Sequence, residues 1–67
     1  MLLRCEPGAV FPAHAHDGDE EILVLEGDFV MGELELSVGD YHVAAKGAAH
    51  PPAFTRSGCL LLVTTAH

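Results

Sequence analysis

The spacing of apolar residues is the feature that most restricts the fold of this 67-residue chain. No stretch of ten or more residues repeats apolar side chains with the 3.6-residue period of a helix. The apolar segments are short instead, and turn-forming glycines separate them, among them Gly8, Gly27, Gly39 and Gly58. Many short strands at this spacing are typical of a small antiparallel β-sandwich or barrel. We therefore expect an all-β fold and a single domain over residues 1–67, because a chain of this length holds one small core.

Alternating and continuous apolar runs locate the individual strands. Leu34, Leu36 and Val38 alternate with polar residues, which predicts a half-buried strand. Gly27-Asp28 is expected to end the strand that begins at Glu20. His50 is expected on a loop, because the two prolines that follow it disfavour any central strand. The expected strands cover residues 2–6, 11–16, 20–26, 33–38, 41–45 and 59–63, with a hairpin turn near Gly32.

Two of these segments are apolar at every position, Ile22–Leu25 and Cys59–Val63. A strand that is apolar on both faces is normally buried on both sides. Burial of a 67-residue chain barely offsets the cost of ordering it, so additional support is expected. The sequence therefore predicts an apolar partner surface outside the chain, and a homodimer is the simplest source of one.

The charge of the chain excludes two classes of partner. Its net charge is −7, from 10 acidic and 3 basic residues, and the three basic residues lie far apart in the sequence. Nucleic-acid binding requires clustered lysine and arginine side chains that neutralise phosphates, so no nucleic-acid partner is expected. An anionic membrane surface is excluded for the same reason, and no apolar run reaches the roughly 18 residues of a membrane-spanning helix.

Cysteine content and the N-terminal residues indicate a cytoplasmic protein. The apolar start is interrupted at Arg4, too early for a signal peptide. The chain contains two cysteines, Cys5 and Cys59, whereas a secreted domain of this size usually carries more. We expect both thiols to be reduced. A bridge between Cys5 and Cys59, which would join the two terminal segments, is the alternative.

Two histidines separated by one residue carry the strongest chemical signal. On a strand, His14 and His16 would lie on one face about 6–7 Å apart, and one metal ion could bind a ring nitrogen of each. Glu20 begins the next expected strand and could return a carboxylate to the same place, while His50 could complete the set. The residues thus predict a site of three imidazoles and one carboxylate. For Glu20 the alternative is a solvated turn carboxylate, because Asp19 and Glu21 flank it.

The same residues resemble the two conserved motifs of the cupin family. The first motif corresponds to Gly8-(five)-His14-Ala15-His16-(three)-Glu20-(six)-Gly27 and the second to Gly39-(five)-Ala45-Lys46-Gly47-(two)-His50. The chain departs from the family at Ala45, where a proline is usual, and at Phe54, where an asparagine is usual. Within the family, residues 15–27 and 58–63 are most similar to the cupin domain of zinc-binding anti-sigma factors of the ChrR type. Small stand-alone cupins are similar too, including relatives of acetylacetone-cleaving dioxygenases.

The resemblance implies a jelly-roll β-barrel, a homodimer, and one divalent transition metal per chain held by His14, His16, Glu20 and His50. Histidine and carboxylate ligands suit Fe, Zn, Mn, Ni and Co alike, so the metal stays open. The chain is short for the family, which leaves open that it is a piece of a longer cupin.

Three functions are compatible with these residues. The first is a small metal-binding cupin with a binding or sensing role, in which a small-molecule ligand could occupy the open metal positions. The second is a metal-dependent dioxygenase that acts on a small diketone-like or phenolic substrate, and the third is an apo ligand-binding domain. The complete ligand set argues against the third. Whether the protein is an enzyme stays open, because fold alone does not fix function. His42 is an additional candidate for the pocket, because it shares strand parity with Ala44.

Overall fold

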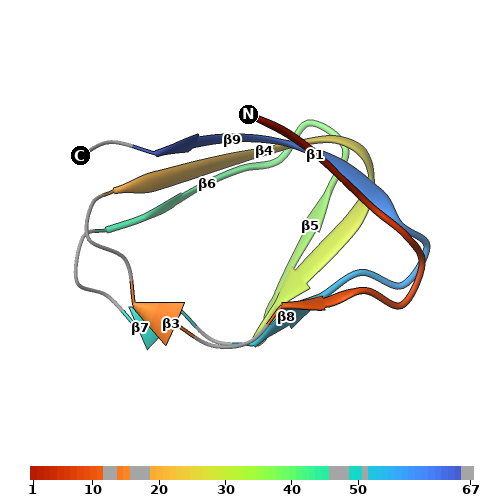
Figure 1. Cartoon of the computed structure of the whole chain (residues 1–67), viewed down its shortest axis with the longest axis horizontal. Coiled ribbons are helices and arrows are strands. Elements are labelled where there is room, and N and C mark those ends of the chain that lie inside the picture. Colours follow the sequence, from red (N-terminus) through yellow and green to blue (C-terminus); the bar gives the residue numbers. More distant parts are fainter. Residues whose placement is uncertain (12–13, 16–18, 46–48, 51, 66–67) are drawn as a thin grey trace.

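Nine strands form the regular structure of this chain in a computed structural model, which describes residues 1–11, 14–15, 19–45, 49–50 and 52–65. No helix occurs among the described residues. The strands are β1 (Leu2–Cys5), β2 (Val10–Phe11), β3 (His14–Ala15), β4 (Glu20–Met31), β5 (Leu34–Ser37), β6 (Tyr41–Ala44), β7 (Ala49–His50), β8 (Ala53–Phe54) and β9 (Cys59–Thr65) (Figure 1). The all-β prediction is confirmed.

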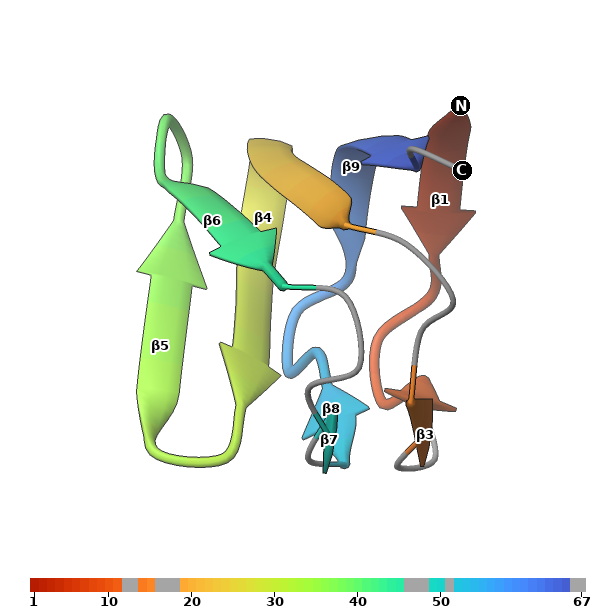
Figure 2. The ribbon, with the colours of Figure 1, turned by 90° about the vertical axis from the view of Figure 1, so that its left-hand side faces the viewer.

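The long strand β4 organises the molecule, because it belongs to both layers of strands. Its first half pairs with β9 and β6, and its second half pairs with β5 and β8. The main sheet runs β1-β9-β4-β8-β2, with β5 and β6 also paired to β4, and β3 and β7 form a separate two-stranded ribbon. All pairings between the described strands are antiparallel. Figures 1 and 2 show the sheet curled over on itself, which confirms the expected antiparallel jelly-roll architecture as a half-barrel.

Gly27 does not end β4, contrary to the prediction. The strand continues to Met31, with an irregularity in the register between Val24 and Glu26. Gly27 has a φ of +79°, a backbone conformation that side-chain-bearing residues rarely adopt. The glycine therefore lets the strand bend from one layer into the other instead of stopping it, as bulges and glycines do in other curved sheets. The turn at Gly32-Glu33 follows at the predicted place.

The core lies between the two layers. Side chains that point inward from β4 and β9 are almost completely buried, with exposed fractions of 2% for Ile22 and 1% for Val24 and Leu61. The rings of Phe11 and Phe29 meet edge to face, with their centroids 5.6 Å apart, so β2 packs against this core.

The burial of β5 agrees with the prediction at one position. Leu36 is buried, whereas Leu34 is exposed, and so is Val38, which follows the end of β5. The alternation of apolar and polar residues therefore located the strand but overstated how much of it the core covers.

The two fully apolar segments are each buried on one face only within this chain. The pairing register aligns four outward positions in one row across the sheet, Leu2, Leu62, Leu23 and Tyr41. Leu2, Leu62 and Tyr41 are exposed. Among the described residues, none covers these side chains on the outer face of β1, β9, β4 and β6.

Candidate metal centre

The backbone pairing of β3 with β7 brings two of the predicted ligands opposite each other. His14 is the register partner of His50, and Ala15 is the partner of Ala49. The two histidines are 36 positions apart in the sequence, so the fold and not the local chain direction creates this juxtaposition. His50 lies in a two-residue strand, where a loop was expected. Among the described strands, β7 pairs with β3 only, so it is not a central strand and the prolines that follow His50 in the sequence do not conflict with it.

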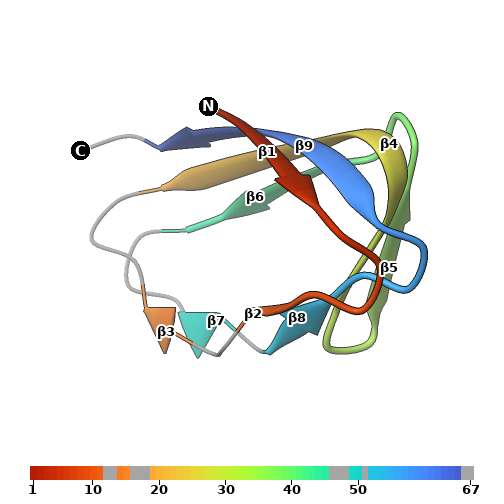
Figure 3. The same ribbon diagram turned by 45° about the vertical axis from the view of Figure 1, so that its right-hand side comes forward.

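Glu20 is placed at the start of β4, where its register partners are Ala44 of β6 and Thr65 of β9. Figures 1 and 3 show this end of β4 and the β3–β7 ribbon at the same end of the molecule. His16 lies outside the described residues, so its position relative to the other three stays a prediction.

A cavity of about 180 Å³ opens inside the half-barrel, and Glu20 is the acidic member of its described lining. The remaining lining is apolar and comes from both layers and from the N-terminus. These residues are Met1, Leu3, Phe11, Ile22, Phe29, Leu61 and Val63. Concave apolar walls with a small number of polar groups are typical of small-ligand sites.

His42 lies beside this region without lining the cavity. It is the register partner of the buried Ile22 and is half-buried, which places its position on the inner face of the sheet. Among the described residues, no group of three or more histidine, cysteine, aspartate or glutamate side chains is arranged to hold a metal ion. His16 and the side chains of His14 and His50 lie outside the described part of the chain. The four-ligand set therefore stays a prediction.

An aspartate outside the predicted site accepts a cluster of hydrogen bonds. Asp28 Oδ1 accepts hydrogen bonds from the Ser57 backbone N–H (2.9 Å) and the Ser57 hydroxyl (2.5 Å), and Oδ2 accepts one from the Arg56 N–H (3.0 Å). The Thr55 hydroxyl donates to the Asp28 carbonyl oxygen at 2.7 Å. The Ser57 hydroxyl and these backbone donors hold the pKa of Asp28 far below its usual range. Its place after the bend at Gly27 indicates a structural role, tying β4 to the turn before β9. No sequence motif had singled out this residue.

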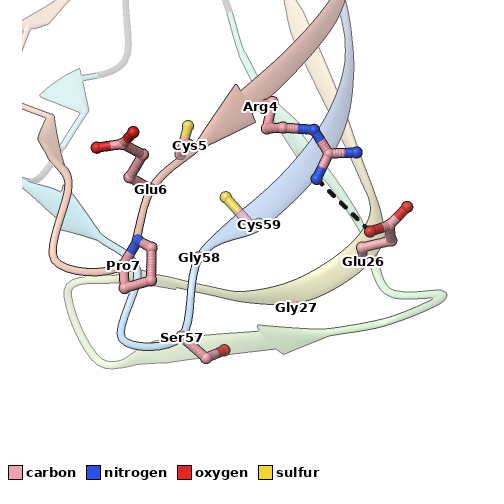
Figure 4. Close-up of a pocket in the computed structure, with 9 residues that line it drawn as sticks. All are labelled: Arg4, Cys5, Glu6, Pro7, Glu26, Gly27, Ser57, Gly58 and Cys59. Carbon is pink, nitrogen blue, oxygen red and sulfur yellow. Dashed lines mark ion pairs between the residues drawn. The ribbon is translucent and has the colours of Figure 1, made fainter.

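The two cysteines form a second cluster, at the opposite end of β9 from Glu20. Cys5 and Cys59 are register partners in the β1–β9 pair, both are buried, and both are free thiols, as expected. A second cavity of about 310 Å³ adjoins them (Figure 4). Burial, together with the hydrogen bond to Cys5, raises the pKa of the Cys59 thiol to about 11.

Comparison with known proteins supports the fold and the family. No helix in the described part of the chain is long and apolar enough to cross a membrane. No curated protein matches the chain. Its structure is similar to a chain in the crystal structure of Rhodobacter sphaeroides SigE in complex with the anti-sigma ChrR. The two are 33% identical, with a TM-score of 0.85, and the match covers 97% of this chain and 36% of the other.

Two further solved structures are similar. One is TT1209 from Thermus thermophilus, with 33% identity and a TM-score of 0.71, covering 97% of this chain and 68% of that one. The other is an acetylacetone dioxygenase from Acinetobacter johnsonii, with 20% identity and a TM-score of 0.85, covering 96% and 47%. This chain therefore spans about a third of the ChrR complex chain and about half of the dioxygenase. The family model of the ChrR cupin-like domain matches residues 1–67, so the chain belongs to the ChrR cupin-like family of cupins.

Proposed function

We propose that this protein is a small metal-binding cupin that holds one divalent transition metal through His14, His16, Glu20 and His50 and serves a binding or sensing role. The observation that carries the proposal is the pairing of His14 with His50 in the β3–β7 ribbon. Directly opposite positions of an antiparallel pair share one face and have Cβ atoms about 4.5–5.5 Å apart. That spacing suits two ligands of one ion.

The chemistry of the donor set supports a transition metal. Neutral imidazoles together with one carboxylate suit Fe, Zn, Mn, Ni or Co, and a six-coordinate ion would keep about two positions open for other ligands. Glu20 lines the apolar cavity inside the half-barrel, so a small molecule in that cavity would lie beside the carboxylate. A bound metal would also stabilise the fold, because the ligands come from segments far apart in the sequence.

A metal-dependent dioxygenase acting on a small diketone-like or phenolic substrate is the second candidate. The likeness to the acetylacetone dioxygenase favours it at the level of the fold. The apolar lining of the cavity suits such a substrate. A redox-active iron would supply the oxygen chemistry when bound, whereas zinc or nickel would favour binding or sensing.

The metal content of the purified protein, measured by elemental analysis without added metal, tests both candidates. About one metal ion per chain is expected in the wild type, and less than about a tenth of that in a His14→Ala/His16→Ala double variant. His67→Ala is the matched control, since it removes a histidine outside the proposed ligand set. Equal metal content in the wild type and the double variant would contradict the site. Iron would favour the dioxygenase, and its oxygen consumption with a diketone would then be measured.

The proposal includes a single cupin domain over residues 1–67 that forms a homodimer in the cytoplasm. The uncovered apolar row on the outer sheet face supports a second copy as its cover, because exposed contiguous apolar surface of this kind marks interfaces. Free buried thiols support a reducing compartment. Sedimentation at micromolar concentration should give twice the mass of one chain. The Leu62→Glu variant should sediment with the mass of one chain, and a wild type with the mass of one chain would contradict the dimer.

A further inference from the structure

Cys5 and Cys59 occupy backbone positions whose spacing is compatible with a disulfide. The two residues are directly opposite each other in the antiparallel β1–β9 pair. Directly opposite residues have Cα atoms about 4.5 or 5.5 Å apart, depending on whether they exchange hydrogen bonds. Both values fall inside the range of about 4.4–6.8 Å found for disulfides.

The neighbouring backbone shows how closely the two segments approach here. A Cβ atom on Gly58, the residue before Cys59, would lie 3.0 Å from the Cys5 carbonyl oxygen. Gly58 has a φ of +91°, so the turn that precedes β9 depends on a glycine at this place. The turn before β9 therefore places Cys59 beside Cys5.

The pair also has access to a small reagent. Both cysteines line the cavity of about 310 Å³, together with Glu6, Pro7 and Ser57. In Figure 4 the two sulfur atoms project to the same side of the β1–β9 pair. Burial raises the pKa of the Cys59 thiol to about 11, so this thiol is protonated near neutral pH and exchanges slowly with a small disulfide.

We propose that Cys5 and Cys59 are a redox-active pair that a low-molecular-weight disulfide oxidises to an intramolecular disulfide, locking the edge strand β1 onto β9. One cysteine loses its proton and attacks a sulfur atom of the small disulfide, which releases one small thiol and leaves a mixed disulfide. The second cysteine then loses its proton and attacks the protein sulfur of that mixed disulfide, so the S–S bond forms and the second small thiol leaves. The two protein thiols are oxidised and the small disulfide is reduced to two thiols. Disulfides in the cytoplasm of most organisms are usually transient and redox-sensing, which fits a reversible covalent link between β1 and β9.

Locking has a mechanical consequence because β1 is held by one neighbour only. Among the described strands, β1 stands at the end of the main sheet and pairs with β9 alone. The reduced strand can therefore separate from the sheet by breaking a single ladder, whereas in the oxidised protein the disulfide holds the Cys5 end of β1 on β9. This inference does not depend on the proposed metal site, since neither cysteine belongs to the ligand set.

Incubation of the protein with glutathione disulfide, followed by intact-mass analysis and non-reducing peptide mapping, tests the pair. The expected product has lost the mass of two hydrogen atoms and contains a Cys5–Cys59 linked peptide. Its melting temperature should rise by roughly 10 °C or more, and amide exchange in β1 should slow. Reduction should reverse all three changes.

Variants and alternative products make the test decisive. Cys5→Ala and Cys59→Ala should each stop at the glutathione adduct and show no stabilisation. In the wild type, a lasting glutathione adduct, a disulfide between two chains, or two unmodified thiols at equilibrium would each overturn the proposal. The wild-type measurements stand alone, so the conclusion does not require either variant to fold.

Discussion

His14 and His50 are paired across the β3–β7 ribbon, although 36 positions separate them in the sequence. The pairing aligns the first predicted metal-binding motif with the second. Metal binding would then be coupled to folding, because a metal that bridges the two strands binds the folded chain and not the unfolded one.

The His50→Ala variant should lose the part of its stability that depends on metal. At a free metal concentration about 100 times the dissociation constant, binding stabilises a protein by about 2.7 kcal/mol. We expect the variant to melt at the same temperature with and without metal, whereas the wild type melts higher with metal. Thermal denaturation of metal-loaded and chelator-stripped samples measures the difference. His67→Ala should keep the full metal-dependent increase, and a similar increase in His50→Ala would remove His50 from the site.

Gly27→Ala should strongly destabilise the fold. An added Cβ would lie 1.9 Å from the Gly58 carbonyl oxygen, and the φ of +79° strains any side-chain-bearing residue. Backbone atoms cannot move aside as a flexible side chain can, so we expect a loss of about 3 kcal/mol or more. Gly8→Ala is the matched control, because Gly8 has a φ of +86° with nothing within 4 Å. It should cost about 1 kcal/mol in urea denaturation. Equal losses in the two variants would contradict the role given to the close approach at Gly27.

Asp28 should contribute stability that disappears in acid. Its pKa in the folded chain lies below the ordinary value of 3.8, so the ionised form is favoured by folding. The contribution is complete above a pH of about 4 and is lost as the pH falls below the unfolded pKa toward the folded one. Asp28→Asn should therefore be less stable at neutral pH and should flatten the acid part of the stability curve.

Glu33→Gln is the control for Asp28→Asn, because Glu33 is an exposed carboxylate in the turn after β4. Denaturant midpoints measured from strongly acid to neutral pH compare the two variants. The same acid dependence in Asp28→Asn and in the wild type would show that the hydrogen bonds to Asp28 do not stabilise its charge.

Cys59 should make the reduced protein less stable in alkali. Its thiol has a pKa of about 11 in the folded chain against an ordinary value of 9.0, so folding favours the neutral form. The contribution is complete below a pH of about 9 and is lost as the pH rises from about 9 to about 11. The loss is on the order of 2 kcal/mol. Urea denaturation of the reduced protein at several pH values measures it.

Comparison with Cys59→Ala separates this effect from that of Tyr41. The Tyr41 hydroxyl donates a hydrogen bond to Glu21, which raises the pKa of Tyr41 above its ordinary value of 10.0. The Cys59→Ala variant should keep the tyrosine contribution and lose the cysteine one, so its stability should fall less as the pH rises from about 9 to about 11. Parallel curves for the two proteins would contradict the pKa assigned to Cys59.

Short-range sequence patterns predicted where the strands are, and long-range packing decided where they bend and which strands they pair with. The apolar runs around Ile22 and Val24 and at Cys59–Val63 correctly indicated strands. The sequence did not reveal that Gly27 bends a continuous strand, since a glycine in a strand can mark either an end or a bend. Only the approach of the Gly58 backbone distinguishes the two. The strand β8 was missed for a different reason, because a two-residue strand has no period to detect.

The candidate site was predictable as a list of residues and not as an arrangement. The sequence by itself determined the all-β class and the family, and it proposed the four ligands, because residue type and spacing encode which chemistry a short segment can offer. The tertiary structure decided that His14 pairs with His50, that Glu20 lines an apolar cavity, and that Cys5 lies opposite Cys59. The two pairings join residues 36 and 54 positions apart. Strand register sets them, and register is fixed by the burial of whole faces of the sheet and not by any local signal.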